Sequence, residues 1–414
     1  MSTGEENYIQ MPTGEGWSMS ETIELDDWEL EKQLYEKIDE LTDAGRHEEA
    51  IASAGEMLRH FPQHEGALYL MSLCYLRMER YEEAENTARE LLAAHPGAEA
   101  GLDLMGMLCY ETGDFRQAAN YFEQCVELNP ESPYYRKWLA RVWYQGLDRH
   151  RAFRRFGRKF RPEYESQVNK AIAMLHEALR LEPDSESHFL ISLCYEALRI
   201  PEKEFEHLKE GILLEPEHIN IHVRLACYYM MHGDLGSAQS HCEMALMLAP
   251  NYSDALTVEQ TIDAYRQNAK SYYNAKKQYW KAICRIHPAV ADHWRQAAHI
   301  QLAYGARPLK ELRTYLKLEP TDLEMQVTYG KLLYDDKQYL SAQRHFRKLD
   351  RLYTGNVHIQ SWLVTISQMN RIKLYSAPVR RWLYRCLIHY PYWILLFLIV
   401  APFYLIGLLF TRRK

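Results

Sequence analysis

Apolar and small residues recur along this chain with a period of about 34 residues, the length of a repeated helix–turn–helix unit. The stretch that begins at residue 65 and the stretch that begins at residue 99 show the pattern most clearly. Residues of the same class stand one period apart in the two stretches: Leu68 and Leu102, Ser72 and Gly106, Ala84 and Ala118. The pattern therefore predicts an all-α chain.

Prolines mark the ends of these periods. A proline that follows the second helix of each unit explains this spacing, because proline cannot continue a helix. The prolines are Pro62, Pro96, Pro130, Pro183, Pro216, Pro250, Pro288 and Pro320. Most of the gaps between them are close to one period, but the gap from Pro130 to Pro183 is longer by about 19 residues. This excess indicates an insertion in the unit that ends at Pro183.

Residues 31–354 resemble the tetratricopeptide-repeat family. In that family, small residues stand where the two helices of a unit approach closely, and large apolar residues fill the space between helices. Two further units carry this pattern, with Leu225, Ala226, Tyr229, Gly233, Ala238, Ala245 and Pro250 in the first and Tyr329, Gly330, Leu333, Tyr339, Ala342 and Phe346 in the second. The resemblance implies an α-solenoid of about nine helix–turn–helix repeats that presents a long binding surface.

The chain is predicted to have seven segments. They are an acidic, disordered N-terminal arm (1–30), repeats 1–3 with the first helix of repeat 4 (31–145), a basic and aromatic insertion (146–165), the remaining repeats (166–356), a capping helix with a basic juxtamembrane stretch (357–386), a transmembrane helix (387–410) and a basic tail (411–414).

The charge of the chain is uneven. The net charge is −7, but residues 351–414 carry nine Lys or Arg and no Asp or Glu, which leaves 40 basic against 56 acidic residues in 1–350. An acidic body disfavours nucleic-acid binding. A basic end favours contact with an anionic surface.

The C-terminal segment 387–410 is predicted to cross a membrane. It carries no charge over about 24 residues, and a hydrocarbon core about 30 Å thick needs about 20 apolar residues as a helix. Cations stand on both sides of it: Arg380, Arg381, Arg385, Arg412, Arg413 and Lys414. A buried apolar helix and a re-entrant hairpin at Pro402 are the alternatives. The large acidic body is expected on the cytoplasmic side, in a bacterial plasma membrane or, alternatively, an organelle outer membrane of a eukaryote.

The insertion combines cations with aromatic residues. It contains Arg149, Arg151, Arg154, Arg155, Arg158, Lys159 and Arg161 together with Phe153, Phe156 and Phe160. Helical spacing of the phenylalanines would place an apolar stripe beside a cationic face. Four interpretations remain for it: a solvated loop, a contact with anionic lipid, a docking site for an acidic partner such as the N-terminal arm, and a single-stranded nucleic-acid contact.

The first helix of each repeat lines the concave groove in the family that the chain resembles. Candidate partner-binding residues at groove positions are Tyr134, Lys137, Arg141, Arg295 and Lys331. The cations among them predict an acidic peptide near repeat 4. The units from residues 65 and 99 place Gly66, Tyr69, Leu73, Ala100, Asp103 and Met107 at these positions. That set lacks the Lys, Asn and Arg combination with which some family members grip a carboxylate, so a chaperone-type clamp is disfavoured.

The sequence predicts a membrane-anchored adaptor that binds other proteins and is not an enzyme. No phosphate-binding loop, nucleophile elbow or zinc-protease motif occurs, and no metal or cofactor site is expected. Two alternatives stay open. One is a regulator that acts on anionic lipid through the insertion. The other is an accessory subunit of a membrane enzyme or transporter.

Overall fold

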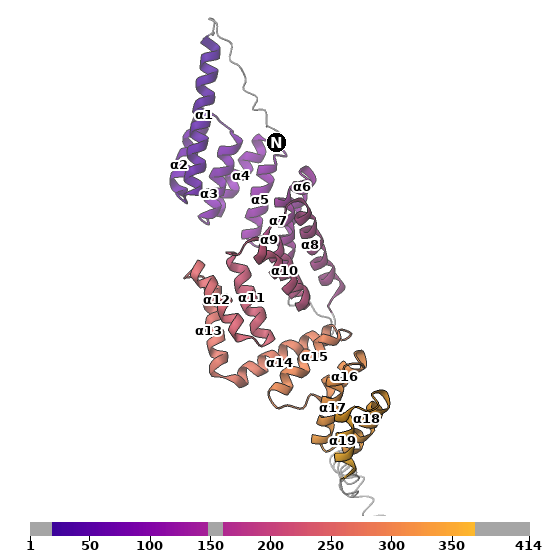
Figure 1. Cartoon of the computed structure of the whole chain (residues 1–414). Coiled ribbons are helices and arrows are strands. Elements are labelled where there is room, and N and C mark those ends of the chain that lie inside the picture. The colour runs from indigo at the N-terminus through magenta and orange to yellow at the C-terminus, as the bar shows by residue number, and fades with distance from the viewer. Residues whose placement is uncertain (1–18, 148–159, 369–414) are drawn as a thin grey trace, which may run out of the picture. The chain divides into compact units, whose positions relative to one another are not determined.

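The chain is described here from a computed structural model, which covers residues 19–147 and 160–368 (Figure 1). Within these two ranges the structure contains 19 α-helices and no β-strand. The chain forms two compact units, of which the first extends to Ile221 and the second begins at His222.

Most of the helices are 13 or 14 residues long. The first unit contains α1 (Met19–Asp43), α2 (His47–His60), α3 (Glu65–Arg77), α4 (Tyr81–Ala94), α5 (Glu99–Glu111), α6 (Phe115–Leu128), α7 (Pro133–Gln145), α8 (Pro162–Leu181), α9 (Ser185–Ala197) and α10 (Pro201–Leu214). After α11 (Ile219–His232), which contains the unit boundary, the second unit has α12 (Leu235–Leu248), α13 (Ser253–Gln267), α14 (Ala269–Ile286), α15 (Ala291–Ala303), α16 (Leu309–Leu318), α17 (Leu323–Asp335), α18 (Tyr339–Leu352) and α19 (Val357–Ser367).

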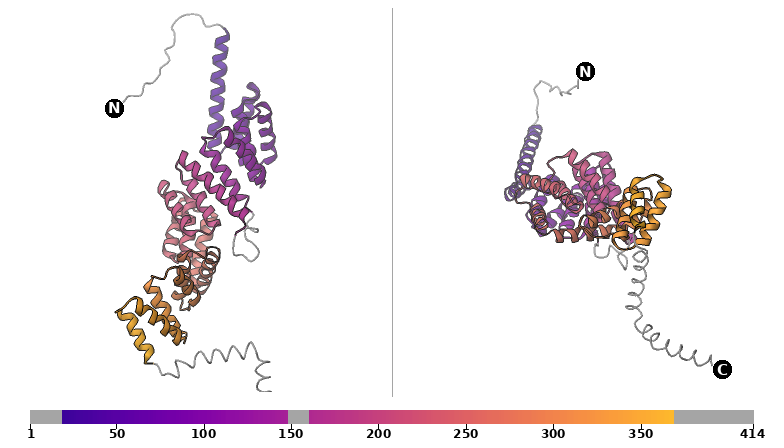
Figure 2. Two further views of the ribbon diagram at one scale, coloured as in Figure 1. Left: turned by 90° about the vertical axis from the view of Figure 1, so that its right-hand side faces the viewer. Right: turned by 60° about the horizontal axis from the view of Figure 1, so that its bottom comes forward.

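Successive helices pack as helix–turn–helix pairs, from α1 with α2 to α17 with α18, and α19 follows the last pair (Figure 2). The second helix of each pair from α2 to α16 ends two residues before one of the eight regularly spaced prolines. The all-helical solenoid predicted from the sequence is therefore confirmed for the described residues.

The turn inside most pairs has a residue in the left-handed conformation two positions after the first helix. Gly113 follows α5 with φ of 84°, and Glu79 follows α3 with φ of 59°. This conformation ends a helix by satisfying its last carbonyl groups, and glycine adopts it at the lowest cost. The two positions stand one period apart, so the same turn is repeated.

A layer of three residues fills the middle of the first unit. Phe122 on α6 is fully buried, and its ring lies parallel to Trp138 on α7, with 5.4 Å between centroids and an angle of 7°. The tip of the same ring meets Gly106 of α5, where a Cβ atom would lie 2.8 Å from the Phe122 ring. Glycine is thus required for this close approach.

The second unit contains the same layer. Phe346 on α18 is fully buried and stacks on Trp362 of α19, with 5.7 Å between centroids and an angle of 4°. A Cβ atom at Gly330 of α17 would lie 2.5 Å from the Phe346 ring. Each of the three residues stands 224 positions after its counterpart in the first unit. The final helix therefore covers the last pair with the same packing that joins repeats in the interior.

Two histidine pairs join the two helices of a repeat, one pair in each unit. His188 on α9 and His207 on α10 lie with their Nδ1 atoms 3.1 Å apart. His222 on α11 and His241 on α12 repeat this contact at 3.0 Å. Burial lowers the pKa of His207 to about 4, with a further contribution from His188. In each pair one ring nitrogen donates and the other accepts, so at least one ring must be neutral.

The N-terminal arm is shorter than predicted. The sequence assigns residues 1–30 to an irregular segment, but α1 begins at Met19. Strong helix formers continue through this stretch, and Leu34 and Ile38 on the following turns pack into the first core. The helix extends from that core toward the N-terminus, and residues 1–18 lie outside the described range.

The insertion also differs from the prediction at its C-terminal end. Residues 146–165 are predicted as an added turn, but α8 begins at Pro162 and has 20 residues. Proline suits the first turn of a helix because that position needs no N–H donor. Phe160 is buried and stacks on Tyr164 at 5.4 Å between ring centroids. The end of the insertion therefore packs as part of the repeat.

The predicted membrane span lies outside the described residues. Among the helices that the structure does describe, none combines the length and the apolar character needed to cross a bilayer. The segment 387–410 stays a prediction from the sequence.

Candidate protein-binding site

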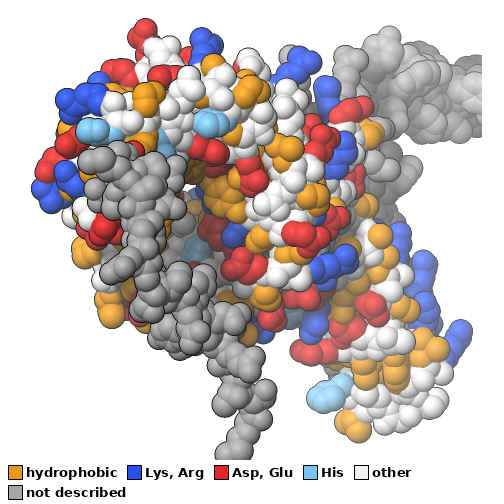
Figure 3. Space-filling view, turned by 90° about the horizontal axis from the view of Figure 1, so that it is seen from above, with side chains coloured by type: hydrophobic (Ala, Val, Ile, Leu, Met, Phe, Trp, Pro, Cys, Tyr) orange, Lys and Arg blue, Asp and Glu red, His pale blue; other side chains and the backbone are white. Residues whose placement is uncertain are grey.

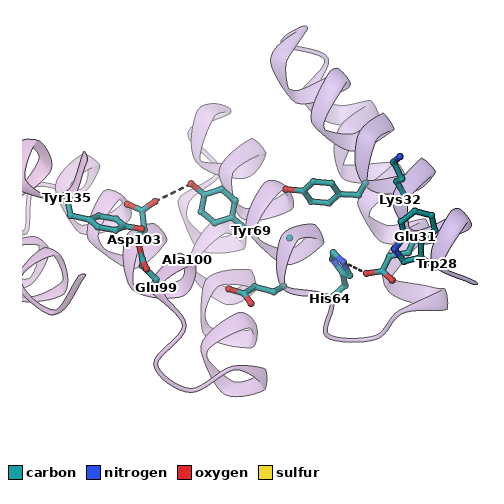
Figure 4. Close-up of a pocket in the computed structure, with 12 residues that line it drawn as sticks. Trp28, Glu31, Lys32, His64, Tyr69, Glu99, Ala100, Asp103 and Tyr135 are labelled. Carbon is teal, nitrogen blue, oxygen red and sulfur yellow. Dashed lines mark hydrogen bonds and ion pairs between the residues drawn. The ribbon is translucent and has the colours of Figure 1, made fainter. Parts of the chain in front are cut away.

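The first unit has a pocket of about 640 Å³ along the first helices of successive repeats (Figure 4). We call it the N-terminal pocket. Its lining comes from α1, from α3 and its N-terminal cap, from α5 and from α7. The lining residues are Trp28, Glu31, Lys32, Tyr35, His64, Glu65, Gly66, Tyr69, Glu99, Ala100, Asp103 and Tyr135.

The repeat itself creates this pocket. Matching positions of α3 and α5 line it one period apart: Glu65, Gly66 and Tyr69 on α3, and Glu99, Ala100 and Asp103 on α5. Small side chains at the second of these positions leave room between the helices. At Gly66 the room is occupied by the Tyr35 ring, with which an added Cβ atom would clash.

Asp103 is the most unusual group in the pocket. Only 2% of this residue is exposed. Its Oδ2 atom accepts a hydrogen bond from the Tyr69 hydroxyl at 3.1 Å and lies 3.5 Å from the Tyr134 hydroxyl. Figure 4 shows the carboxyl group of Asp103 directed toward Tyr69. Within the described residues, Oδ1 has no hydrogen-bond partner.

Burial has the largest effect on the pKa of Asp103. Desolvation raises its pKa to about 6, although the hydrogen bonds from Tyr69 and Tyr134 act in the opposite direction. Burial and the nearby carboxylate also raise the pKa of both tyrosine hydroxyls. Near neutral pH Asp103 is therefore a desolvated carboxylate beside two protonated tyrosines, of which Tyr69 lines the pocket.

The outer part of the pocket is held by a capping histidine. His64 precedes α3, and its Nδ1 atom accepts a hydrogen bond from the Ala67 N–H at 3.1 Å. The Nε2 atom must then carry the proton in the neutral ring, and it donates to Glu31 of α1 at 2.9 Å. This contact joins α1 to α3 at the pocket mouth, beside Lys32, whose ammonium group lies 5.6 Å from the Trp28 ring.

Three of the predicted groove residues lie on α7 and have partners within the fold. Lys137 lies 3.5 Å from Asp184. Arg141 forms an ion pair with Glu186 and lies 5.0 Å from the Trp138 ring. Tyr134 faces Asp103, as described above. The two cations are therefore committed to α9 and its N-terminal cap, and an acidic peptide would have to displace these contacts.

The other two predicted residues lie in the second unit. Lys331 on α17 lies 6.0 Å from the Trp362 ring. Arg295 on α15 contributes to the pKa of Asp322. Burial of that carboxyl group opposes its ionised form, but hydrogen bonds, among them one from Tyr315, and the charge of Arg295 together outweigh this effect, and the pKa is lowered.

The cations of the insertion and of the juxtamembrane stretch lie mostly outside the described residues. Arg161 directly precedes α8 and Phe160 is buried, as described above. The remaining cations and phenylalanines of the insertion, and all six juxtamembrane cations, are not among the described residues. Their contacts with lipid or partner stay predictions.

Tyr69 and Asp103 stand at groove positions in the sequence. From the sequence alone they argue only against a carboxylate clamp, and no binding site is predicted from them. The signal that could identify them as a site is the conjunction of a tyrosine, an acid and small residues at matching positions of two consecutive repeats. No rule based on spacing alone reveals that the acid becomes buried.

On the molecular face in Figure 3, acidic, basic and hydrophobic side chains are interspersed over the described residues. The acidic and aromatic composition of the N-terminal pocket thus contrasts with a mixed surface. Among the described residues, no group of three or more His, Cys, Asp or Glu side chains is arranged to hold a metal ion.

Comparison with known proteins supports the repeat assignment. The tetratricopeptide-repeat family model matches residues 41–108 and a second model of that description matches residues 100–132. No curated protein matches the chain. The resemblance inferred from the sequence is thus confirmed for the repeats within residues 41–132.

Several solved structures are similar in fold to parts of the chain. A thermophilic tetratricopeptide-repeat protein of Thermus thermophilus is 20% identical, with a TM-score of 0.42, over 48% of this chain and 98% of that chain. The pilF protein of Pseudomonas aeruginosa is 13% identical, with a TM-score of 0.44, over 57% and 99%. A tetratricopeptide-repeat protein of Parabacteroides merdae is 14% identical, with a TM-score of 0.44, over 66% and 98%.

Proposed function

Because the chain carries tetratricopeptide repeats, which generally bind other proteins, we propose that it is a scaffold that holds a partner protein at a membrane. The matched models describe an interaction repeat and no catalytic family, which supports a role without catalysis. The observation that carries the proposal is the N-terminal pocket, which opens along the first helices of four successive repeats.

The pocket suits a segment of a partner protein. Its volume of about 640 Å³ is sufficient for one or two side chains rather than a whole domain. The aromatic side chains in its lining offer apolar contact area at a low entropic cost. The partner's remaining residues would continue along the neighbouring first helices.

Crosslinking tests where the partner binds. A photoreactive amino acid in place of Ala100, which lines the pocket, is expected to capture a partner in intact membranes. The same group in place of Glu90, which is exposed on the second helix of a repeat, is the matched control. Equal capture at both positions, or capture at Glu90 alone, would contradict binding in the pocket.

The membrane part of the proposal rests on the sequence. Residues 387–410 carry no charge and have cations on both sides. The orientation proposed for this anchor places the repeats on the cytoplasmic side.

Two charges in the centre of the span should release the protein. An arginine at the centre of a membrane helix costs about 2.5–3.5 kcal/mol, so Leu398→Arg with Ile399→Arg is expected to move the full chain from the membrane pellet to the supernatant after an alkaline wash. Thr411→Arg, outside the span, should leave it in the pellet. A wild-type chain that is already in the supernatant would disprove the anchor.

A further inference from the structure

We propose that the N-terminal pocket receives an arginine side chain of the partner, with Asp103 as its counter-charge. This inference rests on the proposed function, because it specifies the chemistry of the segment that the scaffold binds. It differs from the acidic partner that the sequence predicts near repeat 4.

The charge of the pocket favours a cation. Four carboxylate side chains line it, against one lysine. Glu31 accepts a hydrogen bond from His64, and Glu99 accepts one from Asn129 at 3.2 Å. The lysine, Lys32, lies on α1 at the mouth. An acidic segment would meet net repulsion here, whereas a basic segment would be attracted.

The unsatisfied oxygen of Asp103 specifies where the cation binds. Buried polar atoms nearly always have a hydrogen-bond partner, and an orphan acceptor on a charged group is expensive. The hydroxyl groups of Tyr69 and Tyr134 both point at Oδ2, and each has only one proton to donate. An additional donor for Oδ1 must therefore come from outside the described fold. A guanidinium group is such a donor.

The walls of the pocket favour arginine over lysine or a metal ion. Tyr35, Tyr69 and Tyr135 line the cavity. A guanidinium is planar, stacks on aromatic rings and is more weakly hydrated than an ammonium group, so it loses less on entering a dry site. A divalent metal ion would need several oxygen ligands around one point, and the described residues provide no such group.

A matched set of peptides tests this inference on the full chain in detergent. Each peptide has one central residue in a neutral background, which is arginine, lysine or citrulline. Citrulline keeps the shape of arginine but has no charge. We expect the arginine peptide to bind about tenfold or more tightly than the citrulline peptide, since a hydrogen bond to a charged group contributes strongly. Lysine should lie between them.

Two variants locate the effect. Asp103→Asn keeps the shape of the side chain and should abolish the difference between arginine and citrulline. Glu186→Gln removes a carboxylate that pairs with Arg141 outside the pocket and should preserve the difference. Equal binding of arginine and citrulline to the wild type, binding of neither, or an unchanged difference in Asp103→Asn would overturn the inference.

The peptide test of the arginine inference and the crosslinking test of the proposed function can fail independently. If the group at position 100 still captures a partner but arginine gives no advantage, the scaffold proposal stands and the arginine inference fails. If neither result is obtained, both fail. Thermal melts of Asp103→Asn show whether that variant is folded, so lost discrimination cannot be mistaken for lost structure.

Discussion

Replacing Phe122 with alanine is expected to lower the free energy of unfolding of the first unit by about 3–5 kcal/mol. The side chain is fully buried, stacks on Trp138 and fills the space left by Gly106. Its removal would leave a cavity between α5, α6 and α7 that rigid helices cannot close. Hydrogen exchange with mass spectrometry should show lost protection in these three helices.

Phe346→Ala is the matched variant for this prediction. It removes the equivalent ring from the second unit, so the protection should be lost in α17, α18 and α19 instead. Gly55→Ala in α2 is the opposite control. No atom lies within 4 Å of the added Cβ, and alanine stabilises a helix by about 0.5–1 kcal/mol relative to glycine. A change below about 1 kcal/mol for Phe122→Ala would mean that the stack does not support the fold.

Asp103→Asn is expected to stabilise the protein by about 2–3 kcal/mol near pH 8, which is unusual for a substitution in a buried polar cluster. Burial raises the pKa of Asp103 from 3.8 to about 6, against the hydrogen bonds from Tyr69 and Tyr134. The folded state therefore binds a proton more tightly than the unfolded state. The resulting stability is fully present below about pH 4 and is lost as the pH rises through 6. Asparagine cannot ionise and avoids this loss.

Denaturant melts of the wild type and the variant at two pH values measure this effect. The difference in unfolding free energy should be largest near pH 8 and close to zero near pH 4. Taking the difference between the two proteins cancels the contribution of the histidine pairs, which both share. A variant that is less stable than the wild type near pH 8 would show that the carboxylate is already compensated in the fold. Such a result would also remove the main reason to expect a cationic ligand.

The repeat architecture could be predicted from the sequence because its signals are local and periodic. Small residues such as Gly106 and Gly330 mark close helix contacts, and large residues such as Phe122 and Phe346 fill the space that they leave. The proline two residues after each second helix up to α16 sets the boundary. These features depend on neighbours within one or two repeats, so a single chain reveals them.

The partners of individual charges could not be predicted in the same way. Lys137 and Arg141 stand at groove positions, but their partners Asp184 and Glu186 lie beyond the insertion. The insertion changes the spacing, and only the folded chain shows which acids face which bases. A prediction that treats these cations as free in the groove therefore names an acidic partner. The segment proposed for the N-terminal pocket is instead basic.

The burial of Asp103 is hidden for a related reason. A groove position normally faces solvent, so an acid there would be expected to carry an ordinary solvated charge. Its burial depends on Tyr69 from the preceding repeat and Tyr134 from the following one. The beginning of α1 and the start of α8 at Pro162 are not evident from the sequence, because both segments contain charged and turn residues in mixed order.

The two histidine pairs make one repeat in each unit sensitive to acid. Each Nδ1 contact holds one proton between the rings, and protonation of both rings would place two imidazolium ions with their Nδ1–H groups facing each other about 3 Å apart. Because burial depresses the pKa of His207 below that of an unfolded histidine, the neutral contact contributes stability above about pH 6.5, and this is lost as the pH falls through about 4. Acidification would therefore weaken the contact between the two helices of such a repeat. A partner that depends on the shape of these helices would then be released without any competing ligand.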